Sequence, residues 1–139
     1  MWRPKVFKVL VIEDDDAVRK VVCRILRSVG HEPIEAGDGL AGMAALHREQ
    51  PDLVITDILM PRQEGIETIS QIRDVSGVPI IAISGTQASD TFAPLVDAQM
   101  MGADITLKKP FSVEALLAAV DELLRGDAGG AGFSGGRSS

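Results

Sequence analysis

The 139-residue chain lacks the features that stabilise small secreted domains or anchor a protein in a membrane. Its single cysteine, Cys23, excludes an internal disulfide framework and favours a reducing, cytoplasmic location. No apolar run approaches the roughly 18 residues of a membrane-spanning helix, and the first residues lack a signal-peptide pattern, so we expect no membrane insertion. Acidic residues outnumber basic ones by 20 to 14, and this excess argues against direct binding of nucleic acid through its phosphates.

Composition and length instead indicate one globular domain. Hydrophobic residues make up 45% of the chain and charged residues 24%, which is ordinary for a folded domain of this size. The last 14 residues hold six of the 14 glycines and three serines, and such a segment cannot bury a core. We therefore predict a folded domain over residues 1–125 and a flexible Gly/Ser-rich tail or linker over residues 126–139.

Apolar runs of strand length alternate with stretches of helical periodicity along the predicted domain. The predicted strands are residues 6–12, 31–36, 53–56, 78–83 and 105–107. The predicted helices are residues 18–29, 40–49, 64–74, one within 87–101, and 113–124. This alternation predicts an α/β fold in which helices cover both faces of a five-stranded parallel sheet.

Chemically active residues follow most of the predicted strands. Glu13 and Asp14 follow the first strand, Asp57 the third, Ser84 the fourth and Lys109 the fifth. Ligands of such sheets bind beyond the carboxyl ends of the strands, so we expect these side chains to converge. Closely held carboxylates repel each other, and Mg2+ relieves that repulsion while also binding phosphate oxygens. With Lys109 and Ser84 as phosphate-binding groups, the set indicates phosphoryl transfer with Asp57 as the nucleophile.

Three segments, in order, resemble the response-regulator receiver domain (CheY-like) of two-component signalling. They are residues 9–15 (VLVIEDD), residues 51–61 (PDLVITDILMP) and residues 107–111 (LKKPF). The resemblance covers about residues 6–124. It implies a doubly wound, flavodoxin-like sheet with the strand order 2-1-3-4-5.

The resemblance also implies a role for each acidic residue. Asp57 is expected to accept a phosphoryl group from a histidine kinase or a histidine phosphotransfer protein. Asp14 is expected to bind Mg2+ directly and Glu13 through water. Asp57 and the backbone carbonyl of Leu59 complete the expected metal ligands.

Residues of the fourth and fifth strands are expected to bind the phosphoryl group and transmit the signal. Ser84 matches the hydroxyl residue of the family, Lys109 matches its lysine, and the Lys109–Pro110 bond is expected to be cis. Thr106 stands where the family often has an aromatic switch residue, and it is too small to fill that volume. We therefore expect the signal to pass through the loop at residues 85–92.

The favoured function is a phosphoacceptor switch that passes a conformational change to a downstream protein or a fused output domain. Self-catalysed phosphorylation from small phosphodonors and self-catalysed dephosphorylation are compatible with it, but the chain is not interpreted as an enzyme. One alternative is a haloacid-dehalogenase-like phosphatase that uses Asp14, because residues 14–18 read D-x-D-x-V. Another is an interaction module that is never phosphorylated. The cognate kinase, the output and the oligomeric state are left open.

Basic residues flank the apolar stripe of the first predicted helix. We interpret them as a solvated face, with a docking face for a kinase or phosphotransfer protein as the alternative. These residues are Arg19, Lys20, Arg24 and Arg27.

Overall fold

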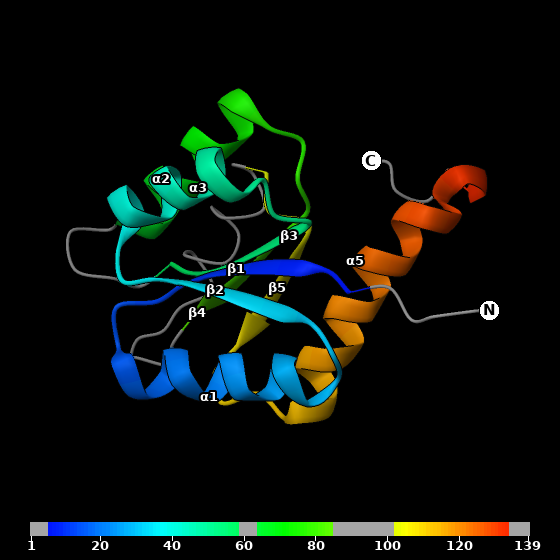
Figure 1. Ribbon diagram of the computed structural model, residues 1–139, viewed down its shortest axis with the longest axis horizontal. Coiled ribbons are helices and arrows are strands. Elements are labelled where there is room, and N and C mark those ends of the chain that lie inside the picture. The colour runs from blue at the N-terminus through cyan, green and yellow to red at the C-terminus, as the bar shows by residue number, and fades with distance from the viewer. Residues whose placement is uncertain (1–5, 59–63, 85–101, 134–139) are drawn as a thin grey trace.

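A five-stranded parallel sheet forms the centre of the molecule, with helices on both of its faces (Figure 1). The computed structural model describes residues 6–58, 64–84 and 102–133, and only the backbone is described for residues 64–66 and 126–133. The strands lie in the order β2-β1-β3-β4-β5, as the resemblance implied. Their bounds are β1 Lys8–Ile12, β2 Glu32–Ala36, β3 Leu53–Asp57, β4 Ile80–Ser84 and β5 Ile105–Lys108.

The described part of the chain contains four helices, two on each face of the sheet. Helices α1 (Asp16–Ser28) and α5 (Val113–Phe133) cover one face, and α2 (Gly39–Glu49) and α3 (Glu64–Val75) cover the other. This arrangement confirms the predicted doubly wound α/β class. The helix predicted within residues 87–101 lies outside the described residues.

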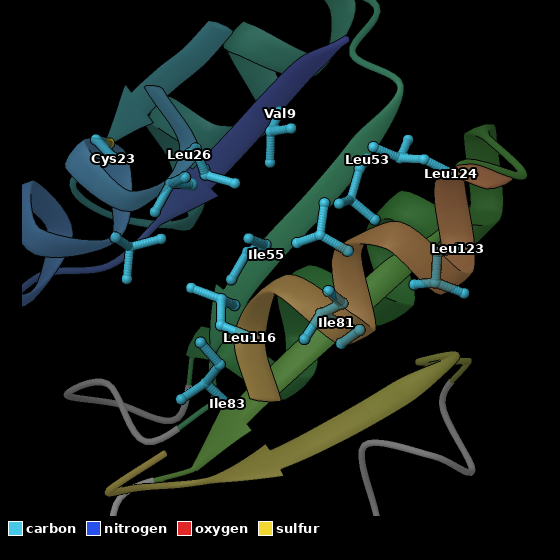
Figure 2. Packing of buried hydrophobic residues seen from close by; sticks show 14 residues of the cluster. Val9, Cys23, Leu26, Leu53, Ile55, Ile81, Ile83, Leu116, Leu123 and Leu124 are labelled. Carbon is cyan, nitrogen blue, oxygen red and sulfur yellow. The ribbon is translucent and has the colours of Figure 1, made fainter. Parts of the chain in front are cut away.

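One hydrophobic core lies between the sheet and the pair α1–α5 (Figure 2). Ile55 and Ile81 face it from the sheet, Leu26 from α1 and Leu116 from α5. Because side chains alternate along a strand, the intervening strand residues, such as Leu10, fill a second core under α2 and α3. Burial on both faces explains why β1, β3 and β4 are almost continuously apolar.

Helix α1 begins within the acidic segment that follows β1. Asp15 is its N-cap residue, and the Asp15 side chain accepts hydrogen bonds from two backbone N–H groups of the first turn at 2.9 and 3.1 Å. At the other end, Gly30 has a φ of +91°, a conformation that glycine adopts without a steric penalty. Because Asp15 caps the helix, the two preceding acids, Glu13 and Asp14, are left for the edge of the sheet.

The register of the sheet brings the predicted functional residues to one edge. Asp57, the last residue of β3, lies opposite Ile83 of β4. Ser84, the last residue of β4, lies opposite Lys108 of β5, and Lys109 follows directly. Parallel strands end on the same side of a sheet, so these three candidates share one edge with the loop that follows β1.

Helix α5 is longer than the sequence pattern predicts. Its backbone is helical as far as Phe133, and Figure 1 shows the last turns projecting beyond the sheet. The helix end predicted at residue 124 is therefore wrong. A formed helix gains one hydrogen bond for each residue that it adds, and no proline follows Pro110 to interrupt it. The division into a domain at residues 1–125 and a tail at residues 126–139 stays a prediction.

Candidate functional site

Three carboxylates meet at the carboxyl edge of the sheet. Glu13 and Asp14 follow β1, Asp57 ends β3, and one carboxylate oxygen from each lies within 4.8 Å of the other two. Glu13 and Asp57 are buried, whereas Asp14 is exposed, so the cluster is reached from solvent on the Asp14 side. The prediction that these three acids converge is confirmed.

Lys109 bridges two of the three carboxylates. Its Nζ donates hydrogen bonds to Asp57 Oδ2 at 3.0 Å and to Glu13 Oε1 at 3.3 Å. The Lys109 side chain is 24% exposed and the two carboxylate side chains are each 5% exposed, so the ion pairs are only weakly screened by water. One ammonium group can neutralise only one carboxylate, so full ionisation of all three acids would leave an excess of negative charge.

The crowding of charge shifts the pKa values of two groups. Burial, followed by the hydrogen bond with Asp57, raises the pKa of Glu13 to about 8. Burial alone would lower the pKa of Lys109, but hydrogen bonds and charges from Asp57 and Glu13 outweigh it and raise that pKa above its ordinary value. The pocket therefore favours positive charge and resists full ionisation of its acids.

These properties fit a hard divalent cation. The donor set consists of carboxylate oxygens, which Mg2+ prefers, and Mg2+ typically keeps several waters beside one or two protein carboxylates. The exposed position of Asp14 leaves the solvent side of the cluster open to such waters. Leu59, the predicted backbone ligand, lies outside the described residues.

The backbone of Asp57 is fixed by neighbouring segments. The N–H of Ile58 donates to the carbonyl of Ile83 in β4 at 2.9 Å, and the hydroxyl of Thr56 lies 3.4 Å from the carbonyl oxygen of Asp57. The first of these contacts holds the end of β3 against β4. The Asp57 carboxylate is therefore presented from a rigid strand end rather than from a loop.

The other predicted residues lie on the β4–β5 side of the edge. Ser84 is buried, and its carbonyl accepts a hydrogen bond from the backbone N–H of Lys109 at 2.7 Å. The Lys109–Pro110 bond is cis, as the resemblance implied. Thr106 is half-buried in β5, three residues before Lys109 and back from the edge where the acids meet. The loop at residues 85–92 lies outside the described residues.

Arg19 contacts the site in a way that its sequence pattern does not predict. Its side chain, interpreted as part of a solvated or docking face, is only 12% exposed. The guanidinium donates to the backbone carbonyl of Glu13 at 2.7 Å, to the carboxylate of Glu35 at 2.9 Å, and to Asp16. The three-residue spacing of Asp16 and Arg19 on one helix could have indicated the last of these contacts.

Comparison with known proteins identifies the family. Residues 9–121 match the response regulator receiver domain. The chain belongs to this family. The receiver domain is a phosphoacceptor module of two-component signalling rather than a conventional enzyme, so this chain is a phosphoacceptor switch. The phosphatase alternative and the alternative of a module that is never phosphorylated are both set aside by this result.

Curated relatives share the match over most of this chain. Response regulator MprA of Mycobacterium leprae is 35% identical over 119 residues, which cover 85% of this chain and 51% of that protein. The probable transcriptional regulator ycf27 of Guillardia theta is 36% identical over 118 residues, covering 85% of this chain and 45% of that protein. The chain thus spans about half the length of the curated relatives it matches.

Solved receiver structures share the fold over nearly their whole length. The chemotaxis response regulator CheY4 of Vibrio cholerae aligns with a TM-score of 0.76 and 28% identity, over 86% of this chain and all (100%) of that one. A CheY-like receiver domain protein of Methanospirillum hungatei aligns with a TM-score of 0.81 and 25% identity, over 90% of this chain and 98% of that one. In the part of this chain that the structure describes, no helix combines the length and hydropathy needed to cross a membrane.

Proposed function

We propose that Asp57 is the residue that accepts the phosphoryl group. The observation that carries this proposal is the placement of Asp57: a buried carboxylate at a rigid strand end, held by Lys109 and clustered with two further acids. One carboxylate oxygen of Asp57 attacks the phosphorus atom of a phosphohistidine. A P–O bond forms, the P–N bond breaks, and the imidazole leaves.

We propose Mg2+ as the cation of the acidic cluster. Asp14 and Asp57 would bind it directly and Glu13 through water, with the backbone carbonyl of Leu59 as a further ligand. When bound, Mg2+ neutralises charge on the transferring phosphoryl oxygens. The oxygen-only donor set and the approach of its three carboxylate oxygens to within 4.8 Å of one another support this proposal.

Lys109 and Ser84 are proposed to hold the phosphoryl group once it is on Asp57. The Lys109 ammonium, which contacts Asp57 Oδ2, would pair with a phosphoryl oxygen. The Ser84 hydroxyl would donate a charge-assisted hydrogen bond to another. We propose that the resulting movement of Ser84 is passed on through residues 85–92, with only a minor part for Thr106.

The partners follow from the family and from the length of the relatives. A kinase partner is implied by family membership, and we propose a histidine kinase or a histidine phosphotransfer protein as the phosphodonor. Because the curated relatives are about twice as long as this match, we propose that the switch controls a fused output domain or a separate protein. We also propose a cytoplasmic location and no direct contact of this segment with nucleic acid.

The test is Mg2+-dependent phosphorylation from acetyl phosphate. We expect the wild-type protein to incorporate one phosphoryl group, and Asp57→Asn to incorporate none, because an amide is not a nucleophile. Asp74→Asn, which removes a negative charge from the exposed side of α3, serves as the matched control and should be phosphorylated normally. Phosphorylation that persists in Asp57→Asn would exclude the assignment.

A further inference from the structure

We propose that Arg19 is a positioning residue that fixes the Glu13–Asp14 segment in the geometry needed for metal binding. This inference rests on the proposed Mg2+ site. Arg19 touches none of the reacting atoms: its contact in the acidic loop is the backbone carbonyl of Glu13. Its effect on the site would therefore be exerted through the loop that carries two of the proposed ligands.

The guanidinium joins three separate parts of the fold. Its Nη1 donates to the carbonyl of Glu13 at 2.7 Å, its Nε donates to Glu35 Oε1 at 2.9 Å, and its Nη2 donates to Asp16 Oδ1. Glu13 belongs to the loop after β1, Glu35 to β2, and Asp16 to the first turn of α1. A planar group bonded on three sides to segments of the sheet and of a helix has little freedom to move.

Arg19 continues the β1–β2 pairing beyond the last paired residues. That pairing ends at Ile12 and Ala36, and the N–H of Glu13 still donates to the carbonyl of Ala36 at 3.0 Å. The carbonyl of Glu13 receives its hydrogen bond from Arg19, and Arg19 is itself held by Glu35, the residue before Ala36. Both polar groups of the Glu13 backbone are thus tied to β2, one directly and one through Arg19.

The sign of the effect on Mg2+ affinity separates positioning from simple electrostatics. Arg19 is a positive charge close to a proposed cation site, so its removal would tighten Mg2+ binding if charge alone mattered. If Arg19 positions the loop, its removal should weaken binding. Loss of a residue that orients metal ligands commonly reduces metal affinity by about 10- to 100-fold.

The experiment compares Mg2+ binding by calorimetry in the wild type, Arg19→Gln, Arg19→Lys and Lys20→Gln. Lys20 is the matched control. It is exposed, and its Nζ lies 3.6 Å from the same Glu35 oxygen. Within the described part of the chain, Lys20 makes no hydrogen bond or ion pair with Glu13. We expect Arg19→Gln to bind about tenfold more weakly and Lys20→Gln to match the wild type. Arg19→Lys should also bind more weakly, because it keeps the charge but loses the planar three-way contact.

A second measurement reports on the metal-free protein. Hydrogen exchange of the backbone amides of residues 13–15 should be faster in Arg19→Gln than in Lys20→Gln, and exchange in β3 should be unchanged. Should Arg19→Gln fail to fold, Arg19→Lys carries the test, because it keeps the positive charge and loses the planar three-way contact.

The outcomes distinguish this inference from the proposed function. A wild-type protein that does not bind Mg2+ would contradict the proposed metal site itself. A wild type that binds, together with an Arg19→Gln variant that binds equally well or more tightly, would overturn the positioning role and leave the metal site intact. An Arg19→Gln variant that is less stable but has unchanged Mg2+ affinity would also overturn the positioning role, and would show that Arg19 only stabilises the fold.

Discussion

Lys109 contacts two of the three acids in the pocket, so removing its charge leaves these two buried groups without their cationic partner. We predict that Lys109→Gln destabilises the metal-free protein by about 1–3 kcal/mol, since breaking a buried ion pair leaves its partners unpaired. Saturating Mg2+ should stabilise Lys109→Gln more than it stabilises the wild type. Urea unfolding with and without Mg2+ measures both effects.

The neighbouring exposed lysine provides the control for this prediction. Lys108→Gln removes the same charge one residue earlier and should change the unfolding free energy by less than about 0.5 kcal/mol. If Lys109→Gln were as stable as Lys108→Gln without metal, the bridge between Glu13 and Asp57 would contribute nothing to stability. That result would contradict the electrostatic description of the pocket.

His31 gives the fold a dependence on pH that is independent of the site. Its ring packs edge-on against Phe7, its Nδ1 is buried without a hydrogen-bond partner among the described residues, and burial lowers its pKa, opposed by the charge of Asp121. The unfolded chain therefore takes up this proton more readily than the folded protein. The contribution of His31 to stability is present above about pH 6.5 and is lost as the pH falls below it.

We predict a shallower loss of stability on acidification for His31→Gln than for the wild type. The difference in unfolding free energy between the two proteins should be smaller at pH 5.5 than at pH 7.5, because only the wild type carries the titrating ring. Asp121→Asn, which removes the opposing charge, should make the loss steeper. Parallel curves for the wild type and His31→Gln would show that His31 is not held neutral by the fold.

At the scale of elements, the packing of α2 on β1 depends on a glycine. A Cβ atom at Gly42 would lie 2.5 Å from Cδ1 of Ile12, and Ile12 is fully buried. We predict that Gly42→Ala destabilises the protein by about 1–3 kcal/mol, because the helix or the buried Ile12 side chain must shift to admit the Cβ atom. Thermal or urea unfolding measures the change.

Gly77 is the matched control for Gly42. A Cβ atom there meets nothing within 4 Å, so Gly77→Ala should be neutral or stabilising by about 0.4–1 kcal/mol through the unfolded state. Equal stabilities of the two variants would mean that α2 and β1 are less closely packed than described.

Most elements could be predicted from local pattern, and the exceptions have physical reasons. The apolar runs around Val9, Ile55 and Ile81 predict buried parallel strands, and all three belong to the sheet. The strand β4 begins at Ile80 rather than at residue 78, because Pro79 has no N–H for the ladder. The sequence pattern predicts too early an end for α5, since glycine content lowers helix propensity without forbidding helical backbone.

At the scale of the whole molecule, the glycine-rich end is predicted to be dispensable. The described core residues of α5 end at Leu124, and residues 126–139 carry six glycines, each about 1 kcal/mol less favourable than alanine inside a helix. Truncation after Arg125 should change the unfolding free energy by less than about 0.5 kcal/mol. It should also leave phosphorylation unchanged, and a large loss of stability would show that the end of α5 packs on the domain.

The composition of the site was predictable and its internal contacts were not. The carboxyl ends of parallel strands share one edge, and this rule alone brings Glu13, Asp57 and Lys109 together. The bridging position of the Lys109 ammonium depends on side-chain geometry that no sequence spacing encodes. The contact of Arg19 with Glu35, 16 residues away, depends on the register of β2 beside β1, so the helical pattern alone predicts only a solvated or docking face for Arg19.

The central claim is that the phosphoryl group is carried by Asp57. The most direct measurement is tandem mass spectrometry of protein treated with acetyl phosphate and Mg2+, after borohydride reduction has converted the acyl phosphate to a stable alcohol. The account predicts reduction at Asp57 alone, and none when Mg2+ is withheld. Reduction at Asp14, or Mg2+-dependent phosphorylation with Asp57 unmodified, would contradict it.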